Sequence, residues 1–348
     1  MTEQIRKGRQ IDWYRTPIDK ELLKRLSGRS DLLGFRQTLG FLGLYALTAG
    51  LALYSFGHWH WAATVLLVFA HGIVASFLGG CGIHELSHNT VFRTRWLNQF
   101  FSWVISLLSW WSHIGFQVSH LRHHAYTLHP PDDLEVVLPA KMPSTAWAWF
   151  TICVFNPIGL RDTVKNTWKT AAGRLEGEWM PKILPESDPK RRRLTNWARA
   201  MLAFHTLLLA TSVTLAVVLK MWALLLLPVL ISCGPFFGGW LVFLCGMPQH
   251  FGLMDNVPDF RLSCRTYTTN PLFGLLYWQM QYHTDHHMYP TVPCYHLKKL
   301  HAAIKHDLPP TPHGLIACWR EMREINAKQR EDPTYQYRAP IPEPVAAA

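Results

Sequence analysis

Long apolar segments alternate with polar, basic segments along the chain, and this pattern predicts helices that cross a membrane. Residues 35–56 and 61–83 are two nearly uncharged runs, each long enough to cross about 30 Å of hydrocarbon as a helix. The connection between them is short, so we expect a tight hairpin. A second hairpin is expected at residues 199–219 and 221–246, with its turn near Lys220. Four crossings put both ends of the chain on one side of the membrane.

Two further apolar, Trp-rich segments, residues 96–111 and 146–160, are short and interrupted. We expect them to form interfacial helices with Trp at the depth of the lipid headgroups. The predicted fold is therefore an all-α integral membrane protein, with four transmembrane helices in two hairpins, interfacial helices and a cytoplasmic histidine-rich cap. The expected parts are a cytoplasmic N-terminal segment at 1–34, a membrane domain at 35–310 and a cytoplasmic tail at 311–348.

Composition and charge support a membrane location. Hydrophobic residues make up 49% of the 348 residues and charged residues 16%, and the formal net charge is +11. The basic residues gather in the first 34 residues, in the stretch 161–199 and in the last hundred. This distribution is typical of positive-inside topology, and it places both termini in the cytoplasm. A nucleic-acid-binding protein would instead need a basic stripe on a soluble module.

Three histidine clusters lie close to the apolar segments. They are His84-Glu-Leu-Ser-His88, His120-Leu-Arg-His123-His124 and His283-Thr-Asp-His286-His287. Residues three or four apart share one face of a helix, so each box can direct two or three imidazoles at one point. Eight imidazoles exceed the three or four protein ligands of one zinc, and imidazole also suits iron, copper or nickel. The boxes therefore predict a buried two-metal centre, with a two-iron, oxygen-activating centre favoured.

Other interpretations explain less of this pattern. Taken alone, His84-Glu85-x-x-His88 matches the zinc-metalloprotease motif, with Glu85 as general base and Asp255 or Asp259 as a third ligand. That interpretation leaves the other six box histidines unexplained. The alternative that the boxes are ordinary solvated surface histidines does not explain their spacing either. A non-catalytic metal-binding or lipid-sensing membrane protein has little reason to keep all three boxes complete.

The order H-x-x-x-H, H-x-x-H-H and H-x-x-H-H over residues 35–310 resembles the membrane fatty-acid desaturase and hydroxylase superfamily. The resemblance implies two non-haem irons at the cytoplasmic ends of four spanning helices, where O₂ is split to attack an unactivated C–H bond. It also implies a further ligand shortly before the third box, at His250 in Met247-Pro-Gln-His250. The implied iron ligands are His84, His88, His120, His123, His124, His250, His283, His286 and His287.

Carboxylates near the boxes are candidates for holding the rings, because a metal-bound histidine normally donates its second N–H to a carboxylate or a carbonyl. We expect this role of Glu85, Asp132, Asp133 and Asp285. No catalytic residue is predicted beyond the metal centre.

The histidines outside the boxes are expected to have ordinary roles. His71 and His205 lie in spanning segments and can link helices by hydrogen bonds, while His113 and His129 flank the second box as possible spare ligands. His301 and its neighbours on the polar C-terminal segment are expected to be solvated.

The predicted function is an O₂-dependent, non-haem di-iron oxidase that acts on the alkyl chain of a lipid. Acyl desaturation is the favoured reaction. Hydroxylation, oxidative demethylation and oxidative decarboxylation to a 1-alkene stay open, because the outcome depends on how the substrate is placed. The sequence holds no haem, iron–sulfur or nicotinamide fingerprint. Electrons are thus expected from a separate ferredoxin, rubredoxin or cytochrome b5 type protein with its reductase. The basic surface suits an acidic partner, and equally anionic lipid.

Overall fold

The computed structural model describes residues 10–342, and every regular element in that range is helical. Extended pairing there is confined to isolated bridges such as that between Phe155 and Phe237. The all-α prediction is confirmed for this part of the chain. The described residues form two compact units: unit 1 holds residues 10–30, 119–142 and 244–342, and unit 2 holds residues 31–118 and 143–243. The predicted domain boundaries after residues 34 and 310 stay predictions.

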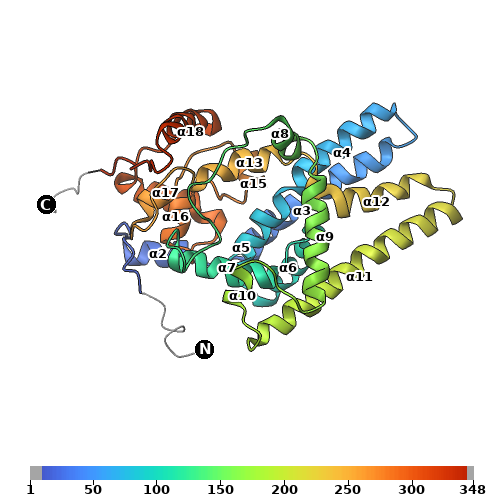
Figure 1. Cartoon of the computed structure of the whole chain (residues 1–348), viewed down its shortest axis with the longest axis horizontal. Coiled ribbons are helices and arrows are strands. Elements are labelled where there is room, and N and C mark those ends of the chain that lie inside the picture. The colour runs from blue at the N-terminus through green and yellow to red at the C-terminus, as the bar shows by residue number, and fades with distance from the viewer. Residues whose placement is uncertain (1–9, 343–348) are drawn as a thin grey trace. The chain divides into compact units, whose positions relative to one another are not determined.

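Unit 2 begins with an antiparallel helical hairpin. Helix α3 (Asp31–Ser55) and helix α4 (Trp61–Ala75) lie side by side (Figure 1). Buried polar contacts join them, because His71 Nδ1 lies 2.9 Å from Thr48 Oγ1, and the Ser55 hydroxyl donates to Thr64 Oγ1 over 2.9 Å. Helix α3 and the helical segment Trp61–Ser87, of which α4 is the first part, are each long and apolar enough to cross a membrane, as predicted for this pair.

The first histidine box lies at the end of this second apolar helix. After α4 the chain continues through the π-helical stretch η1 (Leu78–Ile83) into α5 (His84–Ser87), so that the apolar helix extends over Trp61–Ser87. Helix α6 (Arg95–Ser109) follows, and then α7 (His113–Tyr126), which begins in unit 2 and ends in unit 1. The first box is therefore a continuation of the helical segment that begins at Trp61.

The third long apolar helix, α11 (Pro189–Val218), begins ten residues before the predicted start at 199. Asp188 caps it by accepting a hydrogen bond from the Lys190 backbone N–H over 2.8 Å, and Pro189 fits the first helical position because it has no N–H to satisfy. The basic residues of the first turns belong to the helix, because charged side chains are tolerated at the polar end of a helix.

The predicted fourth span is interrupted. In place of one helix over 221–246 there are two shorter apolar helices, Trp222–Phe236 and Trp240–Gln249. At the break Phe237 is extended, and Gly238 has a φ of +60° and donates its N–H to the Val154 carbonyl over 2.9 Å. Glycine accepts this left-handed conformation without steric cost. The short elements are η2 (Trp222–Leu225), α12 (Leu226–Pro228), η3 (Val229–Cys233), η4 (Gly234–Phe236), α13 (Trp240–Gly246) and η5 (Met247–Gln249).

The other helices of unit 2 are short. They are α8 (Ala146–Cys153), α9 (Pro157–Ala171) and α10 (Trp179–Ile183). Asn156 caps α9 by accepting from the Gly159 N–H over 2.8 Å. Helix α9 packs on α11, and Arg199 of α11 donates to the Ala171 carbonyl at the end of α9 over 2.9 Å.

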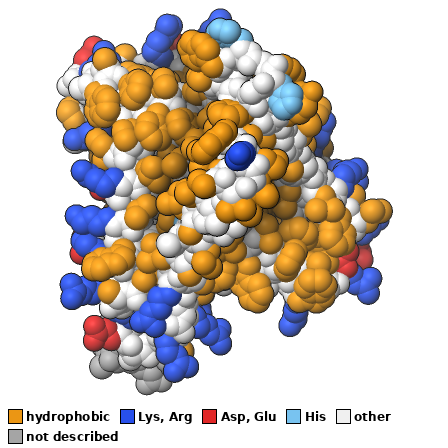
Figure 2. Space-filling model, turned by 90° about the vertical axis from the view of Figure 1, so that its right-hand side faces the viewer, with side chains coloured by type: hydrophobic (Ala, Val, Ile, Leu, Met, Phe, Trp, Pro, Cys, Tyr) orange, Lys and Arg blue, Asp and Glu red, His pale blue; other side chains and the backbone are white. Residues whose placement is uncertain are grey.

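Much of the surface of unit 2 is apolar. Figure 2 looks at the side on which the ends of the α3–α4 and α11–α12 hairpins lie, where hydrophobic side chains cover large areas and basic side chains gather mostly toward the edges. Exposed residues of these helices include Leu47, Leu51, Leu66, Leu207 and Val217. Such contiguous apolar surface is unusual for a protein in water and is typical of a membrane-facing surface.

Replacing Gly72 with valine is expected to destabilise unit 2. A Cβ at Gly72 would lie 2.4 Å from Phe237 Cβ and 2.8 Å from the Phe237 carbonyl oxygen, so backbone must move to admit it. Overpacking of this kind costs about 1–3 kcal/mol. Thermal unfolding in detergent micelles measures the effect, and Gly50→Val in α3 is the control, because a Cβ at Gly50 meets no atom within 4 Å. Equal melting temperatures for the two variants would contradict the expectation.

Unit 1 carries the other two histidine boxes. Besides the end of α13 and η5, its helices are α2 (Lys20–Leu26), the end of α7, α14 (Phe260–Ser263), α15 (Pro271–Leu276), α16 (His283–Met288), η6 (Cys294–His296), α17 (Leu297–Ile304), η7 (Lys305–Asp307) and α18 (Gly314–Glu331). All six residues of α16 are buried. Both α14 and α17 pack against it, and a separate apolar cluster of Phe251, Met322 and Ile325 holds α18 to the unit.

Candidate metal centre

Three segments of unit 1 direct histidines into its interior. Helix α7 carries the second box near its C-terminal end, and α16 carries the third. His250 follows the short helix η5 directly, and it is 5% exposed. Of the seven histidines on these segments, only His124 is more than marginally exposed. Buried imidazoles in such number need partners, because an unpaired polar group costs free energy in an apolar interior.

Four of these rings form what we call the four-histidine cluster: His123, His250, His283 and His287. Each offers a ring nitrogen within 4.8 Å of those of the others, and all four are buried. His283 Nε2 lies 2.9 Å from His250 Nε2 and 3.1 Å from His287 Nε2. One N–H on His283 cannot point at both neighbours, so hydrogen bonds alone do not satisfy this arrangement.

The hydrogen bonds around the cluster fix which ring nitrogens carry protons. His250 Nδ1 lies 2.8 Å from the Ser263 carbonyl and His123 Nδ1 lies 2.7 Å from an Asp133 carboxylate oxygen, so both Nδ1 atoms must donate. The Thr127 hydroxyl donates to the His123 carbonyl and can therefore only accept from His287 Nδ1, 3.1 Å away. In the neutral state all three rings keep a lone pair on Nε2, the atom that a metal binds.

A metal ion accounts for this geometry. Metal–nitrogen bonds of about 2.1 Å place neighbouring ligand atoms about 3.0 Å apart in an octahedral site and about 3.4 Å apart in a tetrahedral one. The Nε2 separations of 2.9 Å and 3.1 Å around His283 match the octahedral spacing. Lone pairs this close repel one another unless a cation lies between them. The four-histidine cluster therefore fits a metal ion with imidazole ligands.

A second group in unit 1 consists of His120, His124 and His286. Their ligand atoms lie within 4.8 Å of one another, and the Nε2 atoms of His120 and His124 are 3.0 Å apart. His120 Nδ1 faces a Glu135 carboxylate oxygen at 2.8 Å, so it donates and leaves Nε2 with a lone pair. The second and third boxes thus divide their rings between two groups, each of which could hold a metal ion.

The first box belongs to unit 2. His84 Nδ1 lies 2.9 Å from Glu85 Oε1, both side chains are buried, and the rings of His84 and His88 are 5.4 Å apart between centroids. Glu85 thus contacts the ring of the neighbouring box residue, and its role in orienting a metal ligand stays a prediction.

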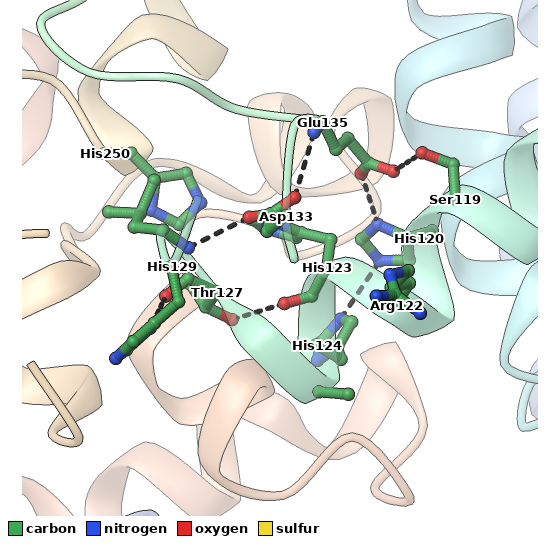
Figure 3. A network of polar contacts seen from close by, with 12 residues as sticks. Ser119, His120, Arg122, His123, His124, Thr127, His129, Asp133, Glu135 and His250 are labelled. Atoms are coloured by element: carbon green, nitrogen blue, oxygen red, sulfur yellow. Dashed lines mark hydrogen bonds and ion pairs between the residues drawn. The ribbon is translucent and has the colours of Figure 1, made fainter. Parts of the chain in front are cut away.

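Carboxylates behind α7 hold the second box in place (Figure 3). Asp133 is fully buried and accepts three hydrogen bonds, from His123 Nδ1 and from the backbone N–H groups of Leu128 and Glu135. Glu135 in turn accepts from His120 Nδ1 and from the Ser119 hydroxyl. The sequence predicts that Asp133 holds a ring of the box, but it gives no signal for Glu135, which lies fifteen residues along the chain from His120.

Two other nominated carboxylates contact different groups. Asp132 pairs with Arg122 at 3.0 Å. Asp285 is fully buried, accepts from the Thr266 hydroxyl over 2.7 Å and lies 3.0 Å from His301 Nδ1. The expectation that His301 is solvated is wrong, because its side chain is only 12% exposed. The reason is that α17 packs against α16, which sequence spacing did not reveal.

Histidines beyond the boxes have structural partners. His71 links α4 to Thr48 and to the Leu230 carbonyl, and His205 lies 2.8 Å from the Ser232 hydroxyl and stacks on Trp110. His129 Nδ1 lies 2.8 Å from the Thr127 carbonyl, and its ring meets the edge of Trp13. None of these rings belongs to either metal-binding group among the described residues.

Electrostatics keep most of the four-histidine cluster neutral. Burial lowers the pKa of His250 to about 3, and burial together with the neighbouring imidazoles lowers the pKa values of His283 and His287 well below the usual range. Burial also acts to lower the pKa of His123, but the hydrogen bond to Asp133 and its charge outweigh this and raise it. Neutral imidazoles are the form that binds metals.

Replacing Thr127 with valine is expected to weaken metal binding without unfolding unit 1. Valine has the same shape but cannot accept from His287 Nδ1, so that ring loses the contact that sets its tautomer. Loss of such a supporting contact costs about 10-fold to 100-fold in metal affinity. Competition with a chelator measures the change, and Thr127→Ser, which keeps the hydroxyl, should restore the affinity. Equal affinities for the valine and serine variants would contradict the assignment.

The described residues thus combine helices long and apolar enough to cross a membrane with buried groups of histidines that could hold metal ions. Residues 58–319 match the family described as "Fatty acid desaturase". The chain therefore belongs to the fatty acid desaturase family. It is also 24% identical over 276 residues to a protein of Calendula officinalis named "Fatty acid conjugase FAC2 A", and the match covers 69% of each chain. Membership in this family supports an oxidoreductase function.

Proposed function

We propose that this protein is an O₂-dependent, non-haem di-iron oxidase that desaturates the acyl chain of a lipid. The observation that carries the proposal is the four-histidine cluster, whose ring nitrogens converge on one point. In three of its rings, Nδ1 donates a hydrogen bond to a neighbouring group, which leaves a lone pair on Nε2 for a metal. The fatty acid desaturase match supports iron as the metal. Imidazole ligands also suit that metal.

In this proposal nine histidines bind two irons. His123, His250, His283 and His287 hold one iron, and His120, His124 and His286 contribute to the other. His84 and His88 of the first box are the remaining two proposed iron ligands, as their sequence pattern predicts. Bound iron supplies the capacity to activate O₂ and to remove hydrogen from an unactivated C–H bond. The chain itself keeps the rings neutral, fixes their orientation through Asp133, Glu135 and Thr127, and excludes water by burial.

Desaturation removes two hydrogen atoms from neighbouring carbons of the acyl chain and reduces one O₂ to two waters. The balance takes two electrons and two protons from outside the substrate. The relative from Calendula officinalis is named a fatty acid conjugase, which favours a fatty-acyl substrate here as well. Hydroxylation, oxidative demethylation and oxidative decarboxylation are alternative outcomes on the same site, because small changes in substrate position decide among them.

We also propose four membrane crossings with both termini and the metal centre on the cytoplasmic side. Three crossings are the long apolar helices, and the fourth is made by the two shorter helices Trp222–Phe236 and Trp240–Gln249. The basic residues at the start of α11 support a cytoplasmic location for that end. Electrons come from a separate small carrier of ferredoxin, rubredoxin or cytochrome b5 type, with its reductase.

The test begins with elemental analysis of the protein purified in detergent. We expect about two irons per chain. Expression in a host whose lipids are then analysed by mass spectrometry should show acyl chains that are two mass units lighter when O₂ is present, and hydroxylated chains if the alternative outcome holds. One zinc per chain, with no change in host lipids, would overturn the proposal and favour the metalloprotease interpretation of His84-Glu85-x-x-His88.

A further inference from the structure

A basic hollow opens on unit 1, beside the third histidine box. It has a volume of about 540 Å³, and its basic lining residues are Lys298, His301, Lys305, His306 and His313, beside the phenol of Tyr282. No carboxylate lines it within residues 10–342. Both lysines, His306 and His313 are exposed, whereas His301 is partly buried. The hollow therefore presents positive charge and N–H donors to whatever it meets.

One lining residue connects this hollow to the metal centre. His301 Nδ1 lies 3.0 Å from Asp285 Oδ1, and Asp285 is fully buried within the third box. Asp285 is the chain neighbour of His286 and lies on α16 with His283 and His287. One side chain and one hydrogen bond thus lead from the hollow to the helix that carries three proposed iron ligands. A surface that serves only to bind lipid headgroups has no need of such a connection.

We infer that the basic hollow docks a small acidic one-electron carrier protein and that His301 and Asp285 form the electron entry to the metal centre. The inference rests on the proposed function, because the proposed desaturation takes two electrons from outside the substrate in each turnover. Complementary charge favours the partner: carboxylates of an acidic carrier meet Lys298 and Lys305, which raises the rate of encounter and fixes its orientation. The hydrogen bond between His301 and Asp285 then gives a short path for electron transfer from the hollow to α16.

The electron balance is simple. Each docked carrier is oxidised by one electron, and the metal centre is reduced by one, so two encounters supply the two electrons that one desaturation takes. The two protons that accompany them come from solvent. No covalent bond forms between the carrier and this protein.

Binding is the first readout, and it does not depend on turnover. Purified protein in detergent is titrated with a plant-type ferredoxin and, separately, with the soluble domain of a cytochrome b5, at low and at high salt. We expect at least one carrier to bind, and the double variant Lys298→Glu/Lys305→Glu to weaken that binding at least about 10-fold at low salt, with the difference fading at high salt. The matched control is Arg320→Glu/Arg323→Glu, which makes the same charge change at two exposed residues of α18 and should weaken binding less than about 3-fold.

The second readout tests the entry route. His301→Gln should leave carrier binding within a factor of about two while slowing reduction of the protein by the bound carrier at least about 10-fold. Reduction by dithionite, a small reductant that needs no docking, should not change. Slowing of both reductants to the same extent would show that His301 only supports the fold and would overturn the route.

The outcomes separate this inference from the proposed function. Iron content is measured on every preparation. If the protein holds two irons and the Lys298→Glu/Lys305→Glu variant binds the carrier as tightly as the unchanged protein, the docking surface is refuted and the di-iron proposal is not. Binding of anionic phosphatidylglycerol micelles at the hollow, with no carrier binding, refutes it as well. A preparation without iron that still binds the carrier through these lysines refutes the di-iron proposal and leaves the docking surface supported.

Discussion

His250→Ala is expected to lower bound metal from about two ions per chain to about one and to reduce turnover at least about 100-fold. His250 Nε2 lies 2.9 Å from His283 Nε2 at the core of the four-histidine cluster, and its Nδ1 is held by the Ser263 carbonyl. Alanine removes one of four ligands and leaves a gap that water fills. The second group, His120, His124 and His286, shares no residue with this cluster and should keep its ion.

Elemental analysis of the detergent-purified variant measures the change, with His129→Ala as the matched control. His129 is also a buried histidine near the second box, 5% exposed, but its ring contacts the Thr127 carbonyl and Trp13 and belongs to neither group. The control should keep both metal ions. Two ions in the His250→Ala protein, or one in the His129→Ala protein, would show that the ligands are wrongly assigned.

Asp133→Asn is expected to cost about 10-fold to 100-fold in metal affinity and in activity. The carboxylate of Asp133 accepts from His123 Nδ1 and Leu128 N–H on one oxygen and from Glu135 N–H on the other. Asparagine has one acceptor oxygen and one NH₂ group. Whichever way the amide turns, its NH₂ faces an N–H donor, so at least one buried hydrogen bond is lost and His123 is no longer held firmly.

Asp132→Asn is the control for this change, because it makes the same chemical substitution at the adjacent residue. Asp132 is partly exposed and pairs with Arg122, and such pairs contribute little. Chelator competition and lipid product yield should therefore be nearly unchanged in Asp132→Asn and strongly reduced in Asp133→Asn. Similar losses in both variants would mean that the loop, and not the contact with His123, controls metal binding.

Asp132 and Asp133 have different contacts in the structure, and the sequence alone does not predict which of them faces the second box. The two residues are adjacent in the chain, eight and nine residues after His124, and the sequence predicts the same role for both. The loop after α7 turns Asp133 inward, where it is fully buried, and leaves Asp132 with Arg122. Glu135 follows the same loop and reaches His120, but no spacing rule connects an acid in an irregular loop to a helical histidine.

The sequence by itself determined the helical class, the two apolar hairpin segments and the histidine boxes, because helical periodicity and apolar run length are local properties that any window of the chain reveals. It also placed His250 among the candidate ligands through its family resemblance. Only the tertiary structure decided which rings share a metal-binding group, why His301 is partly buried against Asp285 and why the predicted fourth span breaks at Phe237–Gly239. Those features depend on contacts between residues far apart in the chain, such as Gly238 with Val154, and no local pattern specifies such contacts.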